Sequence, residues 1–326
     1  MTKTTPQQRD QRHEIPETLA KKPLDIVVRT LFDVSWTKAR DWIAGGKIQL
    51  DGVVTVDSRR LVRGGTHLLL QMNAPRPRPN SLEDKRIVFL DTHVVVVNKP
   101  PGVSTVPYDE SETGTLDERV RDLLARREKN KGARPALGIV HRLDKETSGL
   151  LVFTRSWLAK KSLTQQFREH TTKRRYLAIA HGEVKSLTIT THLVQDRCDG
   201  LRGSLEAMRA RGMRGTGGQE GQLAITHVEA LEKLDGATLI SCKLETGRTH
   251  QIRIHLSESG HPILGDRVYS RHFSGELIPA PRLMLHATEL GFVHPATNSP
   301  MHWEEPMPDD MKETLTRLDH TRRRQS

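Results

Sequence analysis

Apolar residues near the start of the chain recur at helical spacing. Between Leu24 and Leu31 they are separated by three or four residues, which predicts one face of an amphipathic helix, with Pro23 suited to its first turn. Ser35 is a suitable N-cap for a second helix over residues 36–44, and Gly45 would end it. The pattern therefore predicts two short consecutive helices.

The pattern then changes to alternation. Between Ile48 and Val56 apolar and polar residues alternate on either side of an Asp51-Gly52 turn, as in a β-hairpin. We therefore predict that residues 21–72 form one compact unit of two helices and a hairpin. Residues 1–20 are polar and aperiodic and are expected to form a mobile tail.

A second, larger unit is expected after a linker. Residues 73–82 contain the segment APRPRPN, whose prolines predict a stiff, extended connection. The larger unit is expected over residues 83–318, followed by a basic tail at 319–326. A capping box at Thr115–Glu118 and an N-cap at Ser156 predict two helices in it. Apolar runs predict strands at 87–90, 94–97, 150–153, 176–180, 223–231 and 238–244.

Composition narrows the class of protein. No apolar segment approaches the length of about 20 residues that a membrane helix needs, and the first residues have no apolar core typical of a secretory signal. The only two cysteines, Cys198 and Cys242, provide neither a disulfide framework nor a pair of thiols at metal-ligand spacing. We therefore expect a cytoplasmic protein without a bound metal or a membrane partner, and nothing requires more than a monomer.

The charge indicates a polyanionic partner. The net charge is +11, and the first 80 residues hold 14 Lys and Arg against 8 Asp and Glu. Such an excess favours nucleic acid, because basic side chains neutralise phosphates and release counterions. The segment 199–222 is rich in Gly and Arg, and it is either an RNA-contacting loop or a disordered insertion.

The segment HRLDKETSGLLVF, residues 141–153, contains the strongest candidate for chemistry. Asp144 lies between Arg142 and Lys145 on a loop that leads into an apolar strand, and Gly149 precedes that strand. A neighbouring cation favours the ionised carboxylate. These residues alone fit a nucleophile or base and a structural ion pair equally well.

Four segments in order resemble motifs of the RluA-type pseudouridine synthases. They are NKPPGVSTVP (98–107), HRLDKETSGLL (141–151), KRRYLAIAHG (173–182) and LETGRTHQIRIHLSESGHPILGDRVY (244–269). The resemblance implies an α+β fold with a mixed, mostly antiparallel central sheet flanked by helices. It also implies isomerisation of uridine to pseudouridine in RNA without a cofactor.

The same resemblance implies roles for particular residues. Asp144 would be the catalytic carboxylate, Arg253 its basic partner, Tyr176 the side chain that stacks on the base, and Arg142 the residue that fills the space left by a flipped base. Whether Asp144 attacks the sugar or removes a ribose proton stays open. Thr249 is predicted to cap a helix that ends near Gly260 and carries Arg253.

The first unit resembles the alpha-L RNA-binding domain. That resemblance implies phosphate contacts by basic residues of the second helix and the hairpin region: Lys38, Arg40, Lys47, Arg59 and Arg60. In this family such a front domain indicates large-subunit ribosomal RNA as the substrate, with transfer RNA as the alternative.

Two other classes of function compete with this interpretation. One is a non-catalytic RNA-binding factor of ribosome assembly, and the other is a glycoside hydrolase with paired carboxylates, for which Glu146 would supply the second acid. A metal site at His250 and His255 is disfavoured, because their spacing of five places them on different faces of a helix or strand.

Overall fold

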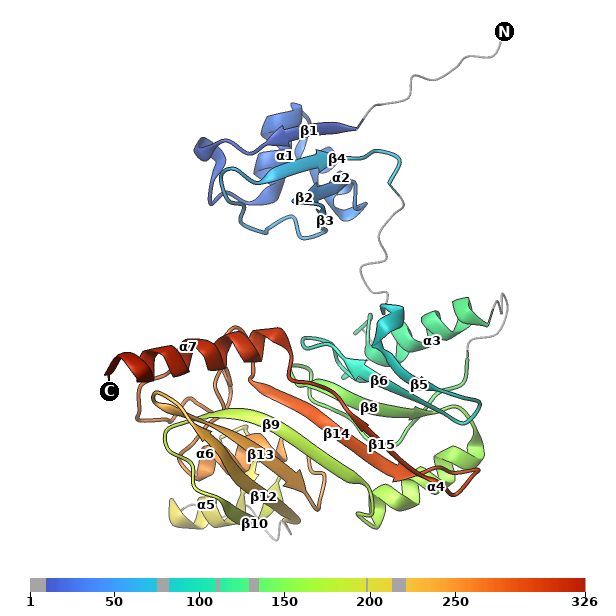
Figure 1. Cartoon of the computed structure of the whole chain (residues 1–326), viewed down its shortest axis with the longest axis vertical. Coiled ribbons are helices and arrows are strands. Elements are labelled where there is room, and N and C mark those ends of the chain that lie inside the picture. The colour runs from blue at the N-terminus through green and yellow to red at the C-terminus, as the bar shows by residue number, and fades with distance from the viewer. Residues whose placement is uncertain are drawn as a thin grey trace. The chain divides into compact units, whose positions relative to one another are not determined.

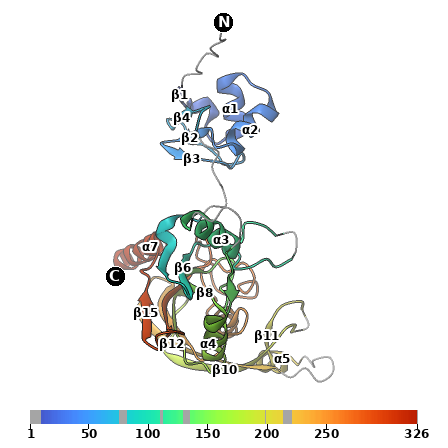
Figure 2. The same cartoon turned by 90° about the vertical axis from the view of Figure 1, so that its right-hand side faces the viewer.

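The computed structural model of the chain describes residues 10–74, 82–109, 112–128, 135–197, 199–212 and 221–325. These residues form two compact units that divide between Ser81 and Leu82, each with its own apolar core (Figures 1 and 2). The division falls within the predicted linker, of which residues 75–81 lie outside the described part.

The N-terminal unit contains the two predicted helices and a small antiparallel sheet. Helices α1 (Leu24–Phe32) and α2 (Trp36–Ala44) have the predicted positions, and the Ser35 side chain caps α2 by accepting the Lys38 N–H at 3.2 Å. The sheet has the order β1-β4-β2-β3, and its strands are β1 (Gln11–Glu14), β2 (Ile48–Leu50), β3 (Val53–Val54) and β4 (His67–Leu70).

The prediction of a mobile tail over residues 1–20 is wrong for its second half. Strand β1 pairs antiparallel with β4, a short 3₁₀ helix follows at Glu17–Leu19, and Ile15 and Leu19 are buried in the core of the unit. The local sequence gives no signal for β1, because its residues are polar and it is stabilised by pairing with the edge of β4, more than 50 residues later in the chain. Residues 1–9 lie outside the described part.

The larger unit is built on a long mixed sheet. The order β11-β10-β12-β13-β9-β14-β8-β6-β5 is joined by β15 on β14 and β7 on β8. Neighbouring strands are antiparallel except β14 and β8, which are parallel. The predicted mixed, mostly antiparallel sheet is thus confirmed. The strands are β5 (Ile87–Leu90), β6 (Val94–Lys99), β7 (Gly138–Ile139), β8 (Ser148–Thr154), β9 (Lys173–His181), β10 (Leu187–Val194), β11 (Gly203–Ser204), β12 (Gln222–Lys233), β13 (Ala237–Leu244), β14 (Leu285–Val293) and β15 (Pro300–Glu304).

Helices cover both faces of this sheet near the β6–β8 pair. Alternate residues of these two strands, such as Val95 and Leu151, pack with α3, while Val96 and Val152 pack with α4. Burial on both faces explains the unbroken apolar runs in the sequence. The helices are α3 (Leu116–Arg127), α4 (Trp157–Arg168), α5 (Leu205–Ala210), α6 (Gln251–Glu258) and α7 (Asp309–Gln325), with a 3₁₀ turn at Asp84–Arg86.

The predicted end of the larger unit is corrected by α7. This helix continues to Gln325, through most of the segment predicted as a basic tail, and its Met311 and Leu318 are buried in the main core. The apolar residues on one face of its first turns anchor α7 to the core, and the polar sequence that follows continues the helix. The unit also begins at Leu82, which is buried in the same core.

The Gly/Arg-rich segment is folded where it is described. Strand β11 and helix α5 lie within it, Ser204 caps α5 by accepting the Ala207 N–H at 3.0 Å, and Met208 is buried. Residues 213–220 of this segment lie outside the described part. Within the ranges that the structure describes, no helix is both long enough and apolar enough to cross a bilayer.

Candidate active site

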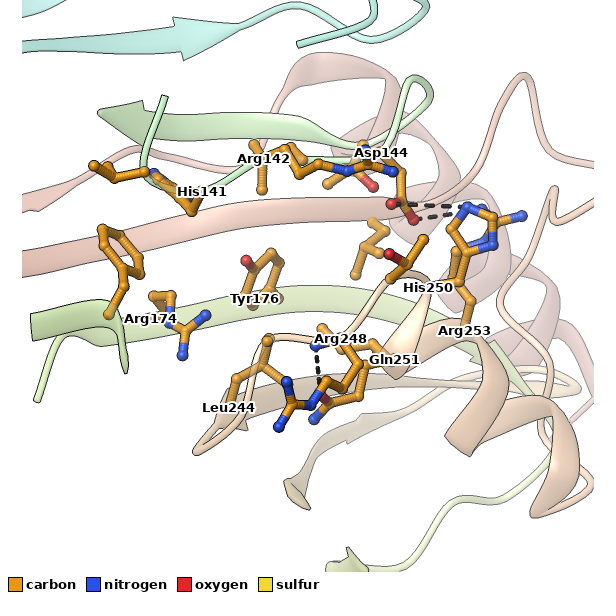
Figure 3. Close-up of a pocket in the computed structure, with 18 of the residues that line it drawn as sticks. His141, Arg142, Asp144, Arg174, Tyr176, Leu244, Arg248, His250, Gln251 and Arg253 are labelled. Atoms are coloured by element: carbon orange, nitrogen blue, oxygen red, sulfur yellow. Dashed lines mark hydrogen bonds and ion pairs between the residues drawn. The ribbon is translucent and has the colours of Figure 1, made fainter. Parts of the chain in front are cut away.

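A cavity of about 470 Å³ collects the side chains that the motifs singled out. It is lined by the loop before β8, by β9, and by the turn that begins α6 (Figure 3). Asp144, Tyr176, Arg253 and Arg142 all contribute to its wall, although they come from segments up to 111 residues apart. The fold thus places together residues that the sequence could only associate by resemblance.

The backbone on both sides of Asp144 is held by buried polar side chains. Thr105 donates its hydroxyl to the Leu143 carbonyl at 2.8 Å and accepts the Leu143 N–H at 3.1 Å. Lys99, which is completely buried, donates to the Lys145 carbonyl at 2.8 Å. Burial lowers the pKa of Lys99 to about 7, although the nearby Asp144 charge opposes this change. The first motif therefore serves to fix the loop that carries the carboxylate.

Arg253 makes its strongest contacts with a residue that the sequence analysis did not single out. Its Nε and Nη2 donate to the two carboxylate oxygens of Asp266 at 2.7 and 3.0 Å, whereas Nη1 reaches Asp144 Oδ2 at 3.4 Å. The bidentate pair is thus with Asp266, and Asp144 receives one longer contact. Asp266 holds the guanidinium in place and leaves the Asp144 carboxylate accessible from the cavity.

The Arg253–Asp266 pair is buried and further satisfied by backbone donors. Asp266 Oδ1 also accepts the N–H groups of Val268 and Tyr269 at 2.9 and 3.0 Å. Burial raises the pKa of Asp266, but the bonds from Arg253 and the backbone outweigh it and lower the value below normal. Burial likewise lowers the pKa of Arg253, yet Asp266 and Asp144 raise it overall. The pair is therefore fully ionised.

His250 lies on the other side of Asp144. Its Nε2 is 3.9 Å from Asp144 Oδ1, and its Nδ1 is 2.8 Å from the hydroxyl of Tyr269. Burial raises the pKa of Tyr269 to about 12, so the phenol keeps its proton and can donate it to Nδ1. We assign the neutral tautomer with the proton on Nε2, facing the carboxylate. Burial lowers the pKa of His250, although Asp144 opposes this.

The start of α6 differs from the predicted cap. The helix begins at Gln251 rather than after Thr249, and His250 precedes it with a left-handed φ of 59°. The Gln251 amide oxygen accepts the Arg248 N–H at 3.0 Å and thereby fixes the turn. Non-glycine residues in this conformation are strained and cluster at functional sites. His255 lies away from the cavity and bonds Thr226 through Nδ1 at 2.9 Å.

Away from Asp144 the cavity wall continues with Tyr176 and then with Arg174 and His141 (Figure 3). Tyr176 is 7% exposed, and burial raises the pKa of its phenol. The His141 ring stacks on Phe167 with 4.4 Å between centroids, and its Nε2 accepts the Val152 N–H at 3.1 Å. Burial, aided by the Arg174 charge, lowers the pKa of His141 to about 3, so this ring is neutral.

Arg142 is exposed at the junction of this cavity with a second one of about 670 Å³. The two cavities share Asp144 and His250, and Tyr108 and Arg202 also line the second. The carboxylate is therefore reachable from a continuous groove that carries basic and aromatic side chains.

The five predicted RNA-contacting residues of the N-terminal unit differ in their surroundings. Four of them are exposed: Lys38, Arg40, Arg59 and Arg60. Of these, Arg40 also donates to Asp25 at 3.0 Å. Lys47 is half-buried and donates to the Ala74 carbonyl. Arg40 and Lys47 thus each have a polar partner within the unit.

One group of side chains in the described ranges has the composition of a metal site. Ligand atoms of Glu289, His302 and Glu304 lie within 4.8 Å of one another. Arg175 pairs with both carboxylates, at 2.7 Å to Glu289 and 3.2 Å to Glu304. The guanidinium thus occupies the position from which a cation would be bound.

Comparison with known proteins agrees with the motifs. Residues 93–258 match the model of the RNA pseudouridylate synthase family. The chain is 35% identical to the ribosomal large subunit pseudouridine synthase D of Neisseria meningitidis serogroup A, over 93% of this chain and 80% of that protein. It is 33% identical to the protein of the same name from Nitrosomonas europaea, over 92% of this chain and 86% of that protein.

A solved structure shares the fold. The structure of human RNA pseudouridylate synthase domain containing 4 superposes with a TM-score of 0.57 at 23% sequence identity. The superposition covers 72% of this chain and 93% of the human chain. The α+β fold expected from the four motifs is thereby confirmed.

Proposed function

Because the chain belongs to the RNA pseudouridylate synthase family, we propose that it isomerises one or more uridines of large-subunit ribosomal RNA to pseudouridine, with Asp144 as the catalytic carboxylate. The family establishes an isomerase that acts on RNA. The names of the relatives from Neisseria meningitidis and Nitrosomonas europaea support the large ribosomal subunit as the source of the substrate.

The observation that carries the proposal is the placement of Asp144. Its carboxylate faces a cavity that also holds Tyr176, and Arg253 is fixed beside it by the buried Asp266. A uridine flipped out of the RNA would place its ribose at Asp144 and its base against the Tyr176 ring. Arg253 places a permanent positive charge 3.4 Å from the carboxylate that would attack C1′ or remove the C2′ proton.

The remaining residues would bind the RNA around the flipped nucleotide. Arg142, which is exposed and lines both cavities, would enter the space that the base leaves. Lys38, Arg59 and Arg60 of the N-terminal unit would neutralise phosphates further along the RNA. We also propose that the protein acts as a monomer, since one chain supplies every side chain named for the site. We propose the cytoplasm as its location, because its proposed substrate is ribosomal RNA.

The test is release of tritium from RNA labelled at C5 of uridine, with large-subunit ribosomal RNA and transfer RNA as parallel substrates. We expect release from the ribosomal RNA that is lost in the Asp144→Asn variant. Release from transfer RNA alone would contradict the substrate. Binding without release from either RNA would favour the non-catalytic assembly factor.

A further inference from the structure

Arg174 is a buried cation that none of the interactions above explains. It lies on β9 two residues before Tyr176, so the two side chains leave the strand on the same face, and both line the cavity (Figure 3). Arg174 is only 7% exposed. Its Nη2 donates to the Glu245 carbonyl at 3.5 Å, and its buried Nε has no hydrogen-bond partner among the residues that the structure describes.

Three other arginines of the described ranges, whose side chains are at most 10% exposed, each face a carboxylate. Arg253 pairs with Asp266 at 2.7 Å, Arg282 with Asp310 at 2.6 Å, and Arg197 with Asp199 at 2.9 Å. Arg174 has no such ion pair within the described ranges, and burial lowers its pKa. A guanidinium nevertheless stays protonated in proteins, so the free enzyme keeps a positive charge in the wall of its cavity. The Phe167 ring, 5.5 Å from the Arg174 Cζ, and the Glu245 carbonyl face this charge, but neither carries a negative charge to neutralise it.

The proposed reaction brings a negative charge to this place. When the C1′–N1 bond breaks, its electron pair leaves with the uracil ring, and the charge spreads over N1, O2 and O4. Figure 3 shows Tyr176 between Arg174 and Asp144. With the ribose at Asp144 and the base along Tyr176, the far edge of the ring, which carries a carbonyl oxygen, points toward Arg174.

We propose that Arg174 is a catalytic residue that stabilises the uracil anion formed when the glycosidic bond breaks. This inference rests on the proposed function. Asp144 attacks C1′ or takes the C2′ proton while N1 keeps the bonding electrons. If Asp144 has attacked C1′, the turned anion forms the C5–C1′ bond while the Asp144–C1′ bond breaks and its electrons return to the carboxylate. If Asp144 has taken the C2′ proton, it returns that proton to C2′ as the C5–C1′ bond forms. On either route the proton at C5 is then lost as N1 gains one. Atoms and electrons balance without a redox partner.

A role of Arg174 in stabilising the uracil anion differs from a role in binding phosphate by the stage of the reaction at which its partner carries negative charge. A phosphate carries its charge before, during and after the reaction, so its partner contributes mainly to RNA affinity. The uracil charge exists only once the glycosidic bond weakens, so its partner contributes to the rate at saturating RNA. Arg174 is therefore expected to affect the rate constant and to leave the dissociation constant nearly unchanged.

The experiment compares Arg174→Met with the matched control Arg175→Met in single-turnover reactions. Arg175 is the next residue of β9 and pairs with Glu289 and Glu304 outside the cavity. We expect Arg174→Met to slow the reaction at saturating RNA about 10²–10³-fold, the range for loss of one preorganised donor to a developing charge. RNA affinity should change by less than about threefold, and the control should keep the full rate.

A second substrate tests the charge itself. RNA with 5-fluorouridine at the target position forms a more stable uracil anion, because fluorine withdraws electrons. Consumption of the fluorinated nucleotide, followed by mass spectrometry of digested RNA, should therefore show a deficit for Arg174→Met at least about tenfold smaller than that with uridine. An equal deficit for both substrates, or a loss of affinity with the saturating rate intact, would overturn the proposal.

Gly247→Ala provides a variant that keeps the charge if Arg174→Met does not fold. An added Cβ would lie 2.5 Å from Arg174 Nη1 and would displace the guanidinium. It should show a smaller deficit that shrinks in the same way with 5-fluorouridine, and an unchanged rate would contradict the proposal. Inactive wild-type protein would reject the proposed function and this role together. Active wild type with a fully active Arg174→Met would reject this role alone.

Discussion

The basic side chains of the two units differ in how they are held. In the N-terminal unit Arg59 and Arg60 are exposed, whereas in the larger unit Arg174 and Arg253 are at most 9% exposed and line the cavity. An exposed cation attracts any phosphate, and salt screens it. A buried cation acts at one position, and its field is stronger because water is excluded. From this difference we propose that the first unit supplies RNA affinity and the second supplies the chemistry.

The largest expected effect is at the carboxylate itself. Asp144→Asn keeps the size of the side chain and removes its charge, so turnover should fall by on the order of 10⁴-fold or more, while the protein still folds and binds RNA. Tritium release under single-turnover conditions, with affinity measured in parallel, is the check. Retained activity would remove Asp144 from the catalytic role.

The next largest effect should follow from breaking the buried pair. In Asp266→Asn, Arg253 loses its bidentate anionic partner and should turn toward Asp144, so the saturating rate should fall about 10²-fold and the free energy of unfolding by about 3 kcal/mol. Asp310→Asn is the control, because it breaks the similar pair with Arg282 away from the cavity. Equal rate losses in both variants would show that Asp266 acts through stability alone.

A smaller effect is expected in the N-terminal unit. Replacing Arg59 and Arg60 together by Gln should weaken RNA binding about tenfold and lower the salt dependence by about two ions, with the saturating rate unchanged. Arg40→Gln should weaken binding less, because Asp25 already holds that guanidinium at 3.0 Å. Titrations at several salt concentrations measure both quantities. A changed catalytic rate with unchanged affinity would contradict the division between the units.

The pH dependence of stability should reflect buried histidines of the larger unit. Burial lowers the pKa of His255 and His286 to about 4, and burial with the Arg174 charge lowers that of His141 to about 3. The unfolded chain, with histidine pKa values near 6.5, binds more protons between pH 6.5 and 4. Stability should therefore fall on acidification, and these three rings together should account for the uptake of about three protons on unfolding near pH 5. Urea unfolding at several pH values measures the total uptake, and His286→Gln should reduce it by about one. A flat dependence would contradict the burial of these rings.

Local sequence signals predicted the elements that they control. The caps at Ser35 and Ser156, the capping box at Thr115 and the apolar run of β8 are all confirmed, because each depends on neighbours within a few residues. Strands β1, β10 and β14 were not predicted, since partners distant in the sequence stabilise them.

The site shows the same limit. The motifs predicted that Asp144, Tyr176 and Arg253 belong together, and the cavity contains all three. Asp266 and His250 lie inside the fourth motif (244–269), but their contacts with Arg253 and Asp144 depend on the turn that precedes α6 and on the loop that follows it. No periodic pattern reports such contacts. Arg174 gave no signal beyond its place beside Tyr176, because burial without a carboxylate is visible only in the folded chain.

The most direct test of the division between affinity and chemistry is the single-turnover rate of the protein lacking residues 1–72, measured by tritium release at saturating RNA. This division predicts a rate within about threefold of the full chain, together with weaker binding and a smaller salt dependence. A rate about 10²-fold lower at saturation, or unchanged affinity, would contradict it.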